Sequence, residues 1–294
     1  MFDWDDLRHF LAVLRAGSLA GAAKKLGIHA TTVGRRIESL EARAGTALFE
    51  RHGRAWVASP AGRALAPRAE RVEAEMLALE REIDGADSRL AGMVRVSATE
   101  MLATRFISPH LGAFTARYPD IVLDLQCTNR PVDLERREAD VALRLSRPQA
   151  PSLVTRRLSA IPLALYASQD YLAARGVPED PDRHLRGHDV VLFADARAFR
   201  LENDWMAERL DGARVIARSD SVSSIYGAAV AGVGLALLPQ KVASEERSLV
   251  RIATRTIPEP REIWQTIHED LRESARVRAV LSFLSEILTD PSEG

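Results

Sequence analysis

An unbroken repeat of apolar side chains between residues 65 and 90 constrains the fold of this 294-residue chain more than any other feature. The apolar positions are separated by alternating steps of four and three residues. A strict 3.5-residue repeat predicts a long helix with a narrow apolar seam, which is typical of helices that pair with a partner helix. The repeat comprises Leu65, Ala69, Val72, Met76, Leu79, Ile83, Ala86 and Leu90.

This segment begins with a helix-start signal, Ser59 followed by Pro60. Ser caps the first turn through its hydroxyl, and Pro is favoured at the first helical position. We therefore expect a linker helix over residues 59–90, either paired with a second subunit or lying on its own domain. The strict repeat favours the homodimer. The residues expected at the dimer contact are Leu65, Val72, Met76, Leu79 and Ile83.

Residues 1–58, ahead of the linker, contain segments of helical periodicity separated by glycines. Gly17 and Gly27 end the first two helices, and Ser18 is placed to cap the second. Nine Lys and Arg face six Asp and Glu, so this part carries +3 although the whole chain carries −1. Such a basic head suggests a nucleic-acid-binding module. Helices are expected over residues 4–16, 19–26 and 30–44.

The run AKKLGIHATTVGRRI, residues 23–37, resembles the helix-turn-helix of DNA-binding repressors. Leu-Gly-Ile lies at the turn, and Val33 and Ile37 stand four apart on the next helix. The opposite face of that helix carries hydroxyl and guanidinium groups, which suit a helix lying in a major groove. An ordinary helical hairpin with solvated basic residues is the alternative.

A turn, an apolar anchor and a short hairpin follow in residues 45–62 and are typical of a wing. With the helices, they make residues 10–62 similar to the DNA-binding domain of the LysR-type transcriptional regulators. The resemblance implies an all-α winged helix-turn-helix that binds double-stranded DNA. The matching positions are Phe10, Val13, Gly17, Ser18, Ala22, Ala23, Leu26, Val33, Arg35, Ile37, Leu40, Glu41, Gly45, Leu48, Phe49, Arg51, Arg54, Ala61 and Gly62.

The expected DNA contacts follow from this resemblance and from side-chain chemistry. Arg35 matches the family's usual Arg and is the candidate for a base or a nearby phosphate contact. Thr31 and Thr32 offer hydroxyls or methyls to base edges. Arg36 and Arg54 are expected at phosphates, which position a protein without specifying sequence.

Ser18 and Lys24 complete the candidate set, with solvated surface as an equal interpretation for Lys24. Arg51 is expected either at DNA or as an ion-pair partner of Glu41 or Glu38. Three residues depart from the family pattern, so its base contacts do not transfer directly. Ala30, Thr31 and Gly34 stand where the family commonly has Gln, Pro and Ser.

Residues 91–294 alternate short strands with helices, which predicts α/β units with mainly parallel strands. The uncharged stretch 221–240 predicts a buried helix, a Gly turn and a strand rather than a membrane span. Strands are expected over residues 93–98, 121–127, 139–145, 153–158, 162–168, 189–194, 213–218, 235–239, 249–252 and 262–268. Helices are expected over residues 102–117, 132–139, 168–175, 222–231 and 274–288.

This order is similar to the LysR-type effector-binding domain, which has a two-subdomain, periplasmic-binding-protein-like α/β fold. The family-like stretches are ARYPDIVLDL, READVALRL, AAVAGVGLALLP and IWQTIHEDLRESARVRAVLSFL. The resemblance implies a small-molecule effector between subdomain I, residues 92–162 and 267–294, and subdomain II, residues 163–266. It also implies a tetramer through these domains.

Ligands of open α/β sheets collect at the carboxyl ends of strands, where helix N-termini present free N–H groups. Polar side chains at these ends are therefore effector candidates, with helix capping or turn formation as the alternative. Glu100 and Asp220 would oppose an anionic ligand, so we do not assign a carboxylate effector from the sequence. The candidates are Ser97, Thr99, Glu100, Thr128 and Ser221.

Motifs for catalysis are missing from the sequence, which contains no G-x-S-x-G, Walker A or H-E-x-x-H. The pair His184 and His188 is interrupted by Gly187 and has no third ligand, and Cys127 is expected to be a buried strand residue. We expect no metal, no cofactor and no enzymatic activity. The first ten residues resemble no signal peptide, so we expect a cytoplasmic protein.

These observations together predict a LysR-type, sequence-specific transcriptional regulator that binds an interrupted inverted repeat as a dimer or tetramer and responds to a small effector. RNA polymerase is a further expected partner. A solute-binding protein and a two-lobed α/β enzyme, neither with a DNA-binding role, are the alternatives. The sequence does not indicate the effector, the target genes or the direction of regulation.

Overall fold

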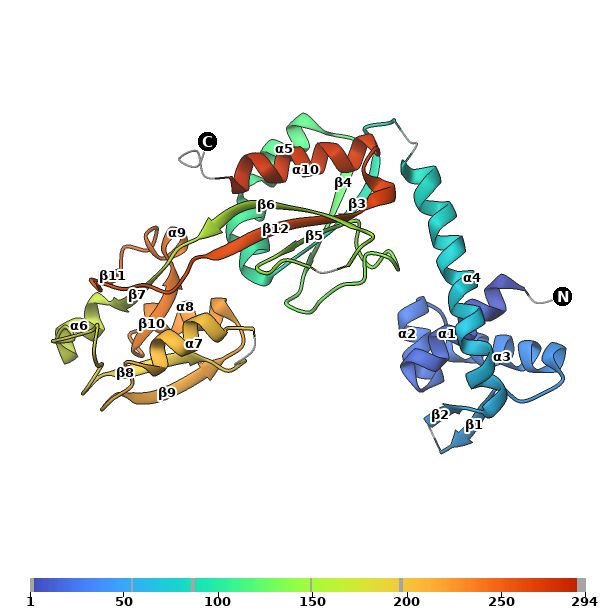
Figure 1. The fold of residues 1–294 in the computed structure, drawn as a ribbon, viewed down its shortest axis with the longest axis horizontal. Helices are drawn as coiled ribbons and strands as arrows, with labels where there is room; N and C mark the ends of the chain where they lie inside the picture. The colour runs from blue at the N-terminus through green and yellow to red at the C-terminus, as the bar shows by residue number, and fades with distance from the viewer. Residues whose placement is uncertain (1–2, 54, 86–87, 149, 196–197, 290–294) are drawn as a thin grey trace. The chain divides into compact units, whose positions relative to one another are not determined.

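The computed structural model describes residues 3–53, 55–85, 88–148, 150–195 and 198–289 (Figure 1). The chain divides into residues 1–83 and residues 84–294, and each unit has its own core.

The first unit is a three-helix bundle followed by a hairpin and a long helix. The three short helices have the bounds that the sequence predicts. They are α1 (Trp4–Ala16), α2 (Leu19–Leu26) and α3 (Ala30–Ala44). Strands β1 (Phe49–His52) and β2 (Ala55–Ala58) pair antiparallel as the wing, and α4 (Pro60–Gly85) follows.

Caps end and start these helices as the sequence predicts. Gly17 and Gly27 adopt left-handed backbone conformations, with φ of 63° and 68°, directly after α1 and α2. The Ser18 hydroxyl accepts the backbone N–H of Gly21 at 3.1 Å and caps α2. The Ser59 hydroxyl accepts the backbone N–H of Gly62 at 3.0 Å and caps α4.

The core of this unit fixes α3 and the wing together. Phe10 and Phe49 contact each other with ring centroids 5.2 Å apart. The Glu41 carboxylate accepts the backbone N–H groups of Leu48 and Phe49 at 2.7 and 3.1 Å, which anchors the start of the wing to α3. The fully buried apolar side chains are Phe10, Leu11, Val13, Ala22, Val33, Ile37 and Leu40.

The apolar repeat of α4 has two environments. Near its start, Leu65 and Ala69 pack against the core of the helical bundle, and Ala69 is only 1% exposed. Further along, Val72, Leu79 and Ile83 are 42%, 52% and 65% exposed. Part of the helix therefore lies on its own domain, and part leaves an apolar stripe open. The helix ends at Gly85 and not at residue 90 as predicted, so Leu90 lies beyond it, and Ala86 lies outside the described residues.

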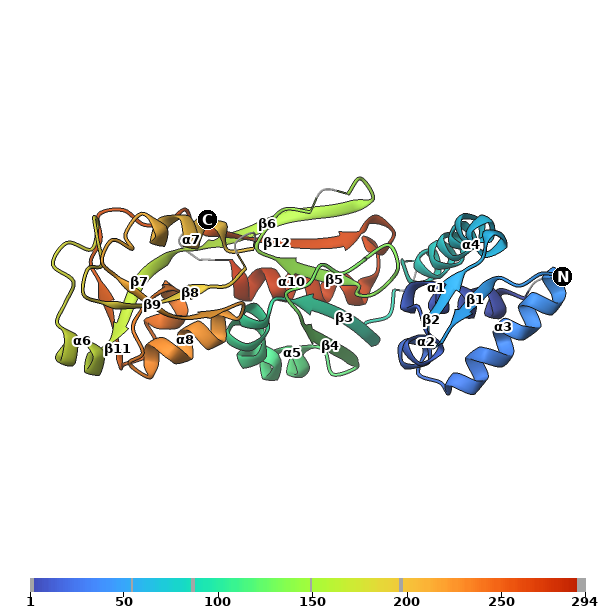
Figure 2. The same cartoon turned by 90° about the horizontal axis from the view of Figure 1, so that it is seen from below.

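Unit two contains two five-stranded sheets, seen side by side in Figure 2. The first has the order β4-β3-β5-β12-β6 and the second β11-β7-β10-β8-β9. Strands of the first sheet are β3 (Gly92–Ala98), β4 (Ile121–Cys127), β5 (Val141–Arg144), β6 (Leu153–Ile161) and β12 (Arg261–His268). Strands of the second are β7 (Leu163–Ser168), β8 (Asp189–Phe193), β9 (Arg214–Ser219), β10 (Leu235–Pro239) and β11 (Leu249–Ile252).

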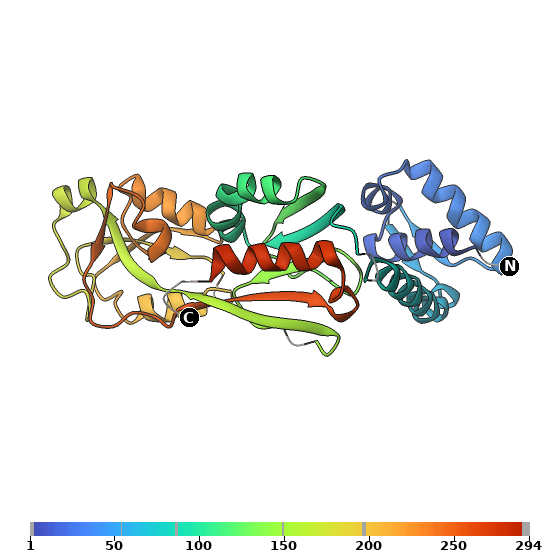
Figure 3. The ribbon, with the colours of Figure 1, turned by 90° about the horizontal axis from the view of Figure 1, so that it is seen from above.

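Helices cover both sheets, and α10 lies along the first (Figure 3). The first subdomain has η1 (Leu102–Ile107), η2 (Ser108–His110), α5 (Leu111–Arg117), η3 (Glu269–Leu271) and α10 (Ala275–Leu288). The second has α6 (Gln169–Arg175), α7 (Arg200–Ala207), α8 (Val222–Val230) and α9 (Gln240–Ala243). The uncharged stretch forms α8 and β10, as predicted, and none of the described helices is long and apolar enough to cross a membrane.

Several local predictions are wrong. The strands are not mainly parallel, because the segments that cross between subdomains return antiparallel: β12 pairs antiparallel with β5 and β6, and β7 pairs antiparallel with β10 and β11. Residues 132–139 form no helix: residues 134–137 make a turn instead, in which Arg137 takes a positive φ of 55° that a helix does not allow. The expected helix 102–117 is split into η1, η2 and α5, and α7 was not predicted.

Cys127 is exposed, contrary to the expectation that it is buried. It is the last residue of β4, which is one of the two edge strands of its sheet.

We predict that Gly62→Ala destabilises the head by about 1–3 kcal/mol or more, as overpacking does. A Cβ at this position would lie 2.1 Å from the backbone oxygen of Leu48, where no flexible side chain can yield. Thermal unfolding of the full chain measures the effect. Gly34→Ala is the matched control, because its Cβ meets only Leu19 at 3.4 Å, and it is expected to unfold no earlier than wild type.

Candidate DNA-binding surface and effector cleft

Helix α3 has a fully buried face and a face open to solvent. Val33, Ile37 and Leu40 are 0% exposed, whereas Thr31 and Arg35 are exposed on the other side and Thr32 is half-buried. No side chain caps the start of α3 at His29, and the backbone N–H of Thr32 donates to the His29 carbonyl at 3.0 Å. Among the described residues, the backbone N–H groups of Ala30 and Thr31 have no partner and could meet an anion. This end of α3 therefore combines hydroxyls, a guanidinium and free backbone donors.

The two neighbouring arginines of α3 have different surroundings. Among the described residues, the Arg35 guanidinium has no ion-pair partner. The Arg36 guanidinium lies 3.1 Å from a carboxylate oxygen of Asp5 and 3.3 Å from one of Asp6. Asp6 is fully buried and also lies 2.9 Å from Arg43, so Arg36 belongs to an ion-pair cluster between α1 and α3. Its expected phosphate contact stays a prediction.

The other DNA-contact candidates are dispersed. The Ser18 hydroxyl caps α2, and Lys24 is exposed on the same helix. Arg54 lies outside the described residues. The Arg51 guanidinium stacks over the Trp56 ring at 4.6 Å and lies 3.7 Å from Glu38, while Glu41 holds the wing instead.

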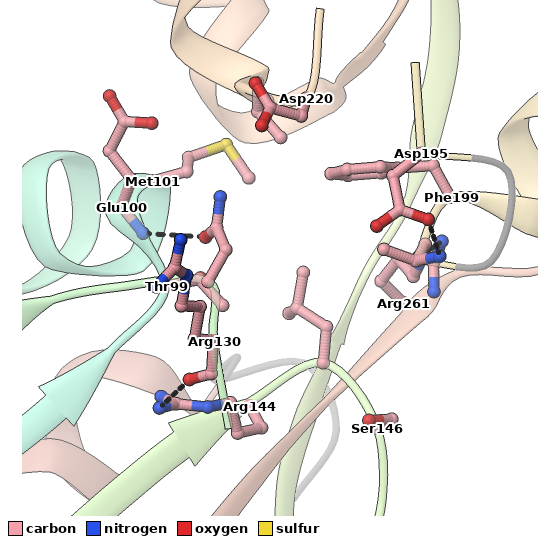
Figure 4. Close-up of a pocket in the computed structure, with 14 residues that line it drawn as sticks. Thr99, Glu100, Met101, Arg130, Arg144, Ser146, Asp195, Phe199, Asp220 and Arg261 are labelled. Atoms are coloured by element: carbon pink, nitrogen blue, oxygen red, sulfur yellow. Dashed lines mark hydrogen bonds between the residues drawn. The ribbon is translucent and has the colours of Figure 1, made fainter. Parts of the chain in front are cut away.

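In the second unit, a cavity of about 440 Å³ lies where strands of both sheets end (Figure 4). Thr99 follows β3, Asn129 and Arg130 follow β4, and Arg144 ends β5. Asp195 and Asp220 follow β8 and β9 of the second sheet. The parallel strands of both subdomains thus direct their carboxyl ends to one cleft, the arrangement expected of α/β ligand sites.

Two of the five effector candidates, Thr99 and Glu100, line this cavity. The Thr99 hydroxyl is buried without a hydrogen-bond partner. Ser97, Thr128 and Ser221 do not line the cavity but hold residues that do. The Ser97 hydroxyl accepts from Arg144 at 2.8 Å, and the Thr128 hydroxyl accepts the backbone N–H of Arg130 at 3.2 Å.

Ser221 and Glu100 contact each other across the cleft. The Ser221 hydroxyl donates to the Glu100 carboxylate at 2.8 Å and accepts the backbone N–H of Ser224 at 3.2 Å. The hydroxyl thus caps α8 and also joins the two subdomains. Capping, which was the alternative interpretation for Ser221, is one of its two roles.

Arg144 is a cavity residue that the sequence interpretation missed. Within the described part of the chain, its guanidinium donates only to neutral oxygens: the backbone oxygens of Ser97 at 3.0 Å, Leu143 at 2.8 Å and Arg130 at 3.0 Å, and the Ser97 hydroxyl. Burial lowers the pKa of Arg144. The available signal was a charged residue at the end of an otherwise apolar strand, VALR at residues 141–144.

Phe199 and Arg261 also line the cavity and were missed. Phe199 stacks on Phe193 with ring centroids 4.0 Å apart. The Arg261 guanidinium pairs with the buried Glu202 and donates to the backbone oxygen of Ala198 at 2.7 Å. Arg261 is thus already neutralised, unlike Arg144.

Together these features define a transcriptional regulator that carries a winged helix-turn-helix and a two-subdomain ligand-binding domain in the same polypeptide. Comparison with known families agrees. The family of LysR substrate binding domains matches residues 87–289, and the bacterial regulatory helix-turn-helix proteins of the lysR family match residues 4–63. The chain belongs to the LysR-type transcriptional regulators, and it is a DNA-binding transcriptional regulator with an effector-binding domain rather than a solute-binding protein or an enzyme.

Individual relatives resemble most of the chain. An HTH-type transcriptional regulator of Xanthomonas campestris is 31% identical over 242 residues, which are 80% of this chain and 70% of the relative. The regulator CrgA of Neisseria meningitidis is 26% identical over 292 residues, 97% of this chain and 96% of the relative. The full-length structure of the Vibrio cholerae virulence activator AphB, 25% identical, matches with a TM-score of 0.67 over 98% of this chain and 100% of that chain.

We predict that Arg36→Ala lowers the free energy of unfolding by about 1–3 kcal/mol, because it removes an ion-pair partner from the buried Asp6 carboxylate. Arg35→Ala, on the same helix, is expected to change it by less than about 0.5 kcal/mol, as an exposed substitution does. Chemical denaturation of the two variants measures the difference. Equal loss of stability in both would contradict the separate roles of the two arginines.

Proposed function

We propose that this regulator binds an interrupted inverted repeat as a homodimer, with α3 of each subunit in a major groove. The exposed face of α3 carries this proposal, because the side chains of Arg35, Thr31 and Thr32 lie there beside the uncapped backbone N–H groups of Ala30 and Thr31. Arg35 is assigned to a base or an adjacent phosphate. Lys24, Ser18 and Arg54 are assigned to the surrounding backbone of the DNA.

The exposed part of the α4 stripe supports the dimer. Val72, Leu79 and Ile83 are large apolar side chains at a 3.5-residue repeat, and burying them against the same stripe of a second copy would remove them from water. Met76 lies between them and is half-buried. A dimer holds two copies of α3 at a fixed separation, which matches two half-sites.

The cleft is proposed as the effector site and as the control of the DNA-bound arrangement. The Glu100–Ser221 hydrogen bond spans the two subdomains at the edge of the cavity. An effector shifts the equilibrium between subdomain arrangements only if it binds one of them more tightly. A ligand that contacts residues on both walls would bind the open and closed arrangements with different affinity, since the distance between the walls changes when the cleft opens or closes.

Selection of bound sequences from a random duplex pool tests the DNA proposal. Wild type is expected to enrich an inverted repeat, with an affinity that falls steeply as salt rises. Arg35→Ala is expected to lose about 1–3 kcal/mol of binding to that repeat. A wild-type protein that enriches no sequence, or an Arg35→Ala variant that binds the repeat unchanged, would contradict the proposal.

The oligomer is tested separately. Leu79→Lys places a charge in the exposed stripe and is expected to convert the dimer to a monomer and to lose cooperative binding to two half-sites. Glu82→Lys, an exposed position outside the stripe, is the matched control and should remain dimeric. Sedimentation analysis distinguishes the two masses. A dimeric Leu79→Lys variant would show that the stripe is not the contact.

A further inference from the structure

The cavity has charges of opposite sign on its two walls. Arg130 and Arg144 belong to the first subdomain, whereas Asp195 and Asp220 belong to the second. Figure 4 shows the two arginines at the lower left of the cavity, Asp220 above and Asp195 to the right. Glu100 and Arg261 also line the cavity, but the Glu100 carboxylate accepts the Ser221 hydroxyl and the Arg261 guanidinium is paired with Glu202. The charged groups that a ligand would meet are therefore Arg130 and Arg144 on one wall and Asp220 on the other.

Within the described residues, no carboxylate pairs with the Arg144 guanidinium. The guanidinium donates to backbone and hydroxyl oxygens, none of which carries a formal charge. A partly buried cation without an anion is unfavourable, and a ligand carboxylate in the cavity would compensate it. Arg130 lines the same wall, and its side chain has no partner within the described part of the chain.

Neutral donors on this wall suit the same carboxylate. The Thr99 hydroxyl is buried and has no hydrogen-bond partner among the described residues. Asn129 accepts the backbone N–H of Glu100 through Oδ1 at 3.3 Å, which leaves its amide NH2 group as a donor. The Glu100 carboxylate is already engaged by the Ser221 hydroxyl.

The opposite wall disfavours a ligand that is only an anion. The Asp220 carboxylate has no partner among the described residues, and a ligand that fills the cleft takes it out of water. Asp195 adds a second carboxylate on this side, with Oδ1 accepting the backbone N–H of Ala198 at 3.0 Å. An ammonium group on the ligand would offset this cost.

Apolar side chains fill the space between the charged groups. Met101 and Leu145 come from the first subdomain, and Phe199 and Val222 from the second. The stack of Phe199 on Phe193 gives this part of the cavity a firm aromatic wall.

We propose that the effector is a small zwitterion with an apolar body, an apolar or aromatic α-amino acid being the simplest case. Its carboxylate meets Thr99, Arg130 and the field of Arg144, its ammonium meets Asp220, and its side chain lies against Met101 and Phe199. This rests on the proposed use of the cleft as the effector site.

Calorimetric titration of the full-length protein tests the proposal. The first probes are Ala, Val, Leu, Ile, Met, Phe, Tyr and Trp as free amino acids. At least one should bind, and its deaminated and decarboxylated analogues (3-phenylpropionate and phenethylamine in the case of Phe) should bind roughly tenfold more weakly or worse, as expected when a charge-assisted hydrogen bond is lost. Failure of all eight to bind, or equal binding of the analogues, would overturn the proposal.

Two variants test which wall of the cavity contacts each charged group of the amino acid. Asp220→Asn should weaken the amino acid roughly tenfold while leaving the deaminated analogue unchanged or tighter, and Thr99→Val should weaken both. Asp120→Asn, an exposed residue outside the cavity, makes the same charge change and should alter neither. An Asp220→Asn variant with wild-type preference would overturn the ammonium contact.

The same preparation binds or fails to bind the selected DNA repeat, and that result is independent of the titration. Amino-acid binding without DNA binding would refute the proposed DNA function alone. DNA binding without amino-acid binding would refute the zwitterion alone.

Discussion

The packing of α3 determines what this protein can present to DNA. Val33, Ile37 and Leu40 are completely buried, which fixes the rotation of the helix about its axis. Burial of the opposite face is therefore sufficient to turn Thr31 and Arg35 to solvent. The Asp6 cluster with Arg36 and Arg43 adds an electrostatic constraint between α1 and α3, so one arginine of the adjacent pair holds the helix and the other remains available. The binding surface is thus a consequence of the core.

The apolar repeat of α4 packs against the core of the head at its start and leaves its later residues exposed for a second contact. Its first residues complete the core of the head, since Ala69 is buried against it, and only the later ones stay open. The Arg15 guanidinium pairs with Glu73 at 2.8 Å and joins α1 to the middle of α4. The start of the linker is therefore rigidly continuous with the head, so that a contact made by the open stripe would determine the separation of the two α3 helices.

Local signals predicted the head almost completely, because its helices are bounded by Gly and Ser caps and filled by one apolar stripe each. The second unit was less predictable. The direction of its strands depends on which segments cross between subdomains, and no local pattern encodes that pairing. Thr99 and Glu100 were found because they follow a strand end. Arg144 and Phe199 were missed because their role depends on neighbours more than forty residues away, Ser97 in one case and Arg261 in the other.

Two of the arginines that line the cavity, Arg261 and Arg144, illustrate how neighbouring residues determine what a charged side chain can bind. Arg261 is paired with the buried Glu202, so its charge is satisfied before any ligand arrives. Arg144 is held as firmly, but by neutral oxygens, and burial lowers its pKa. A charge that is fixed in position yet uncompensated gains most from an incoming anion, because no ordering of the side chain remains to be done. The same reasoning applied to Asp220, which is exposed and unpartnered among the described residues, assigns the opposite pole of the cleft to a cation. Arg144 and Asp220 lie on different subdomains. A ligand that carries both charges would therefore bind most tightly to the arrangement of subdomains in which both groups reach it. Such a difference in affinity between arrangements is what an effector needs in order to control the DNA-bound state.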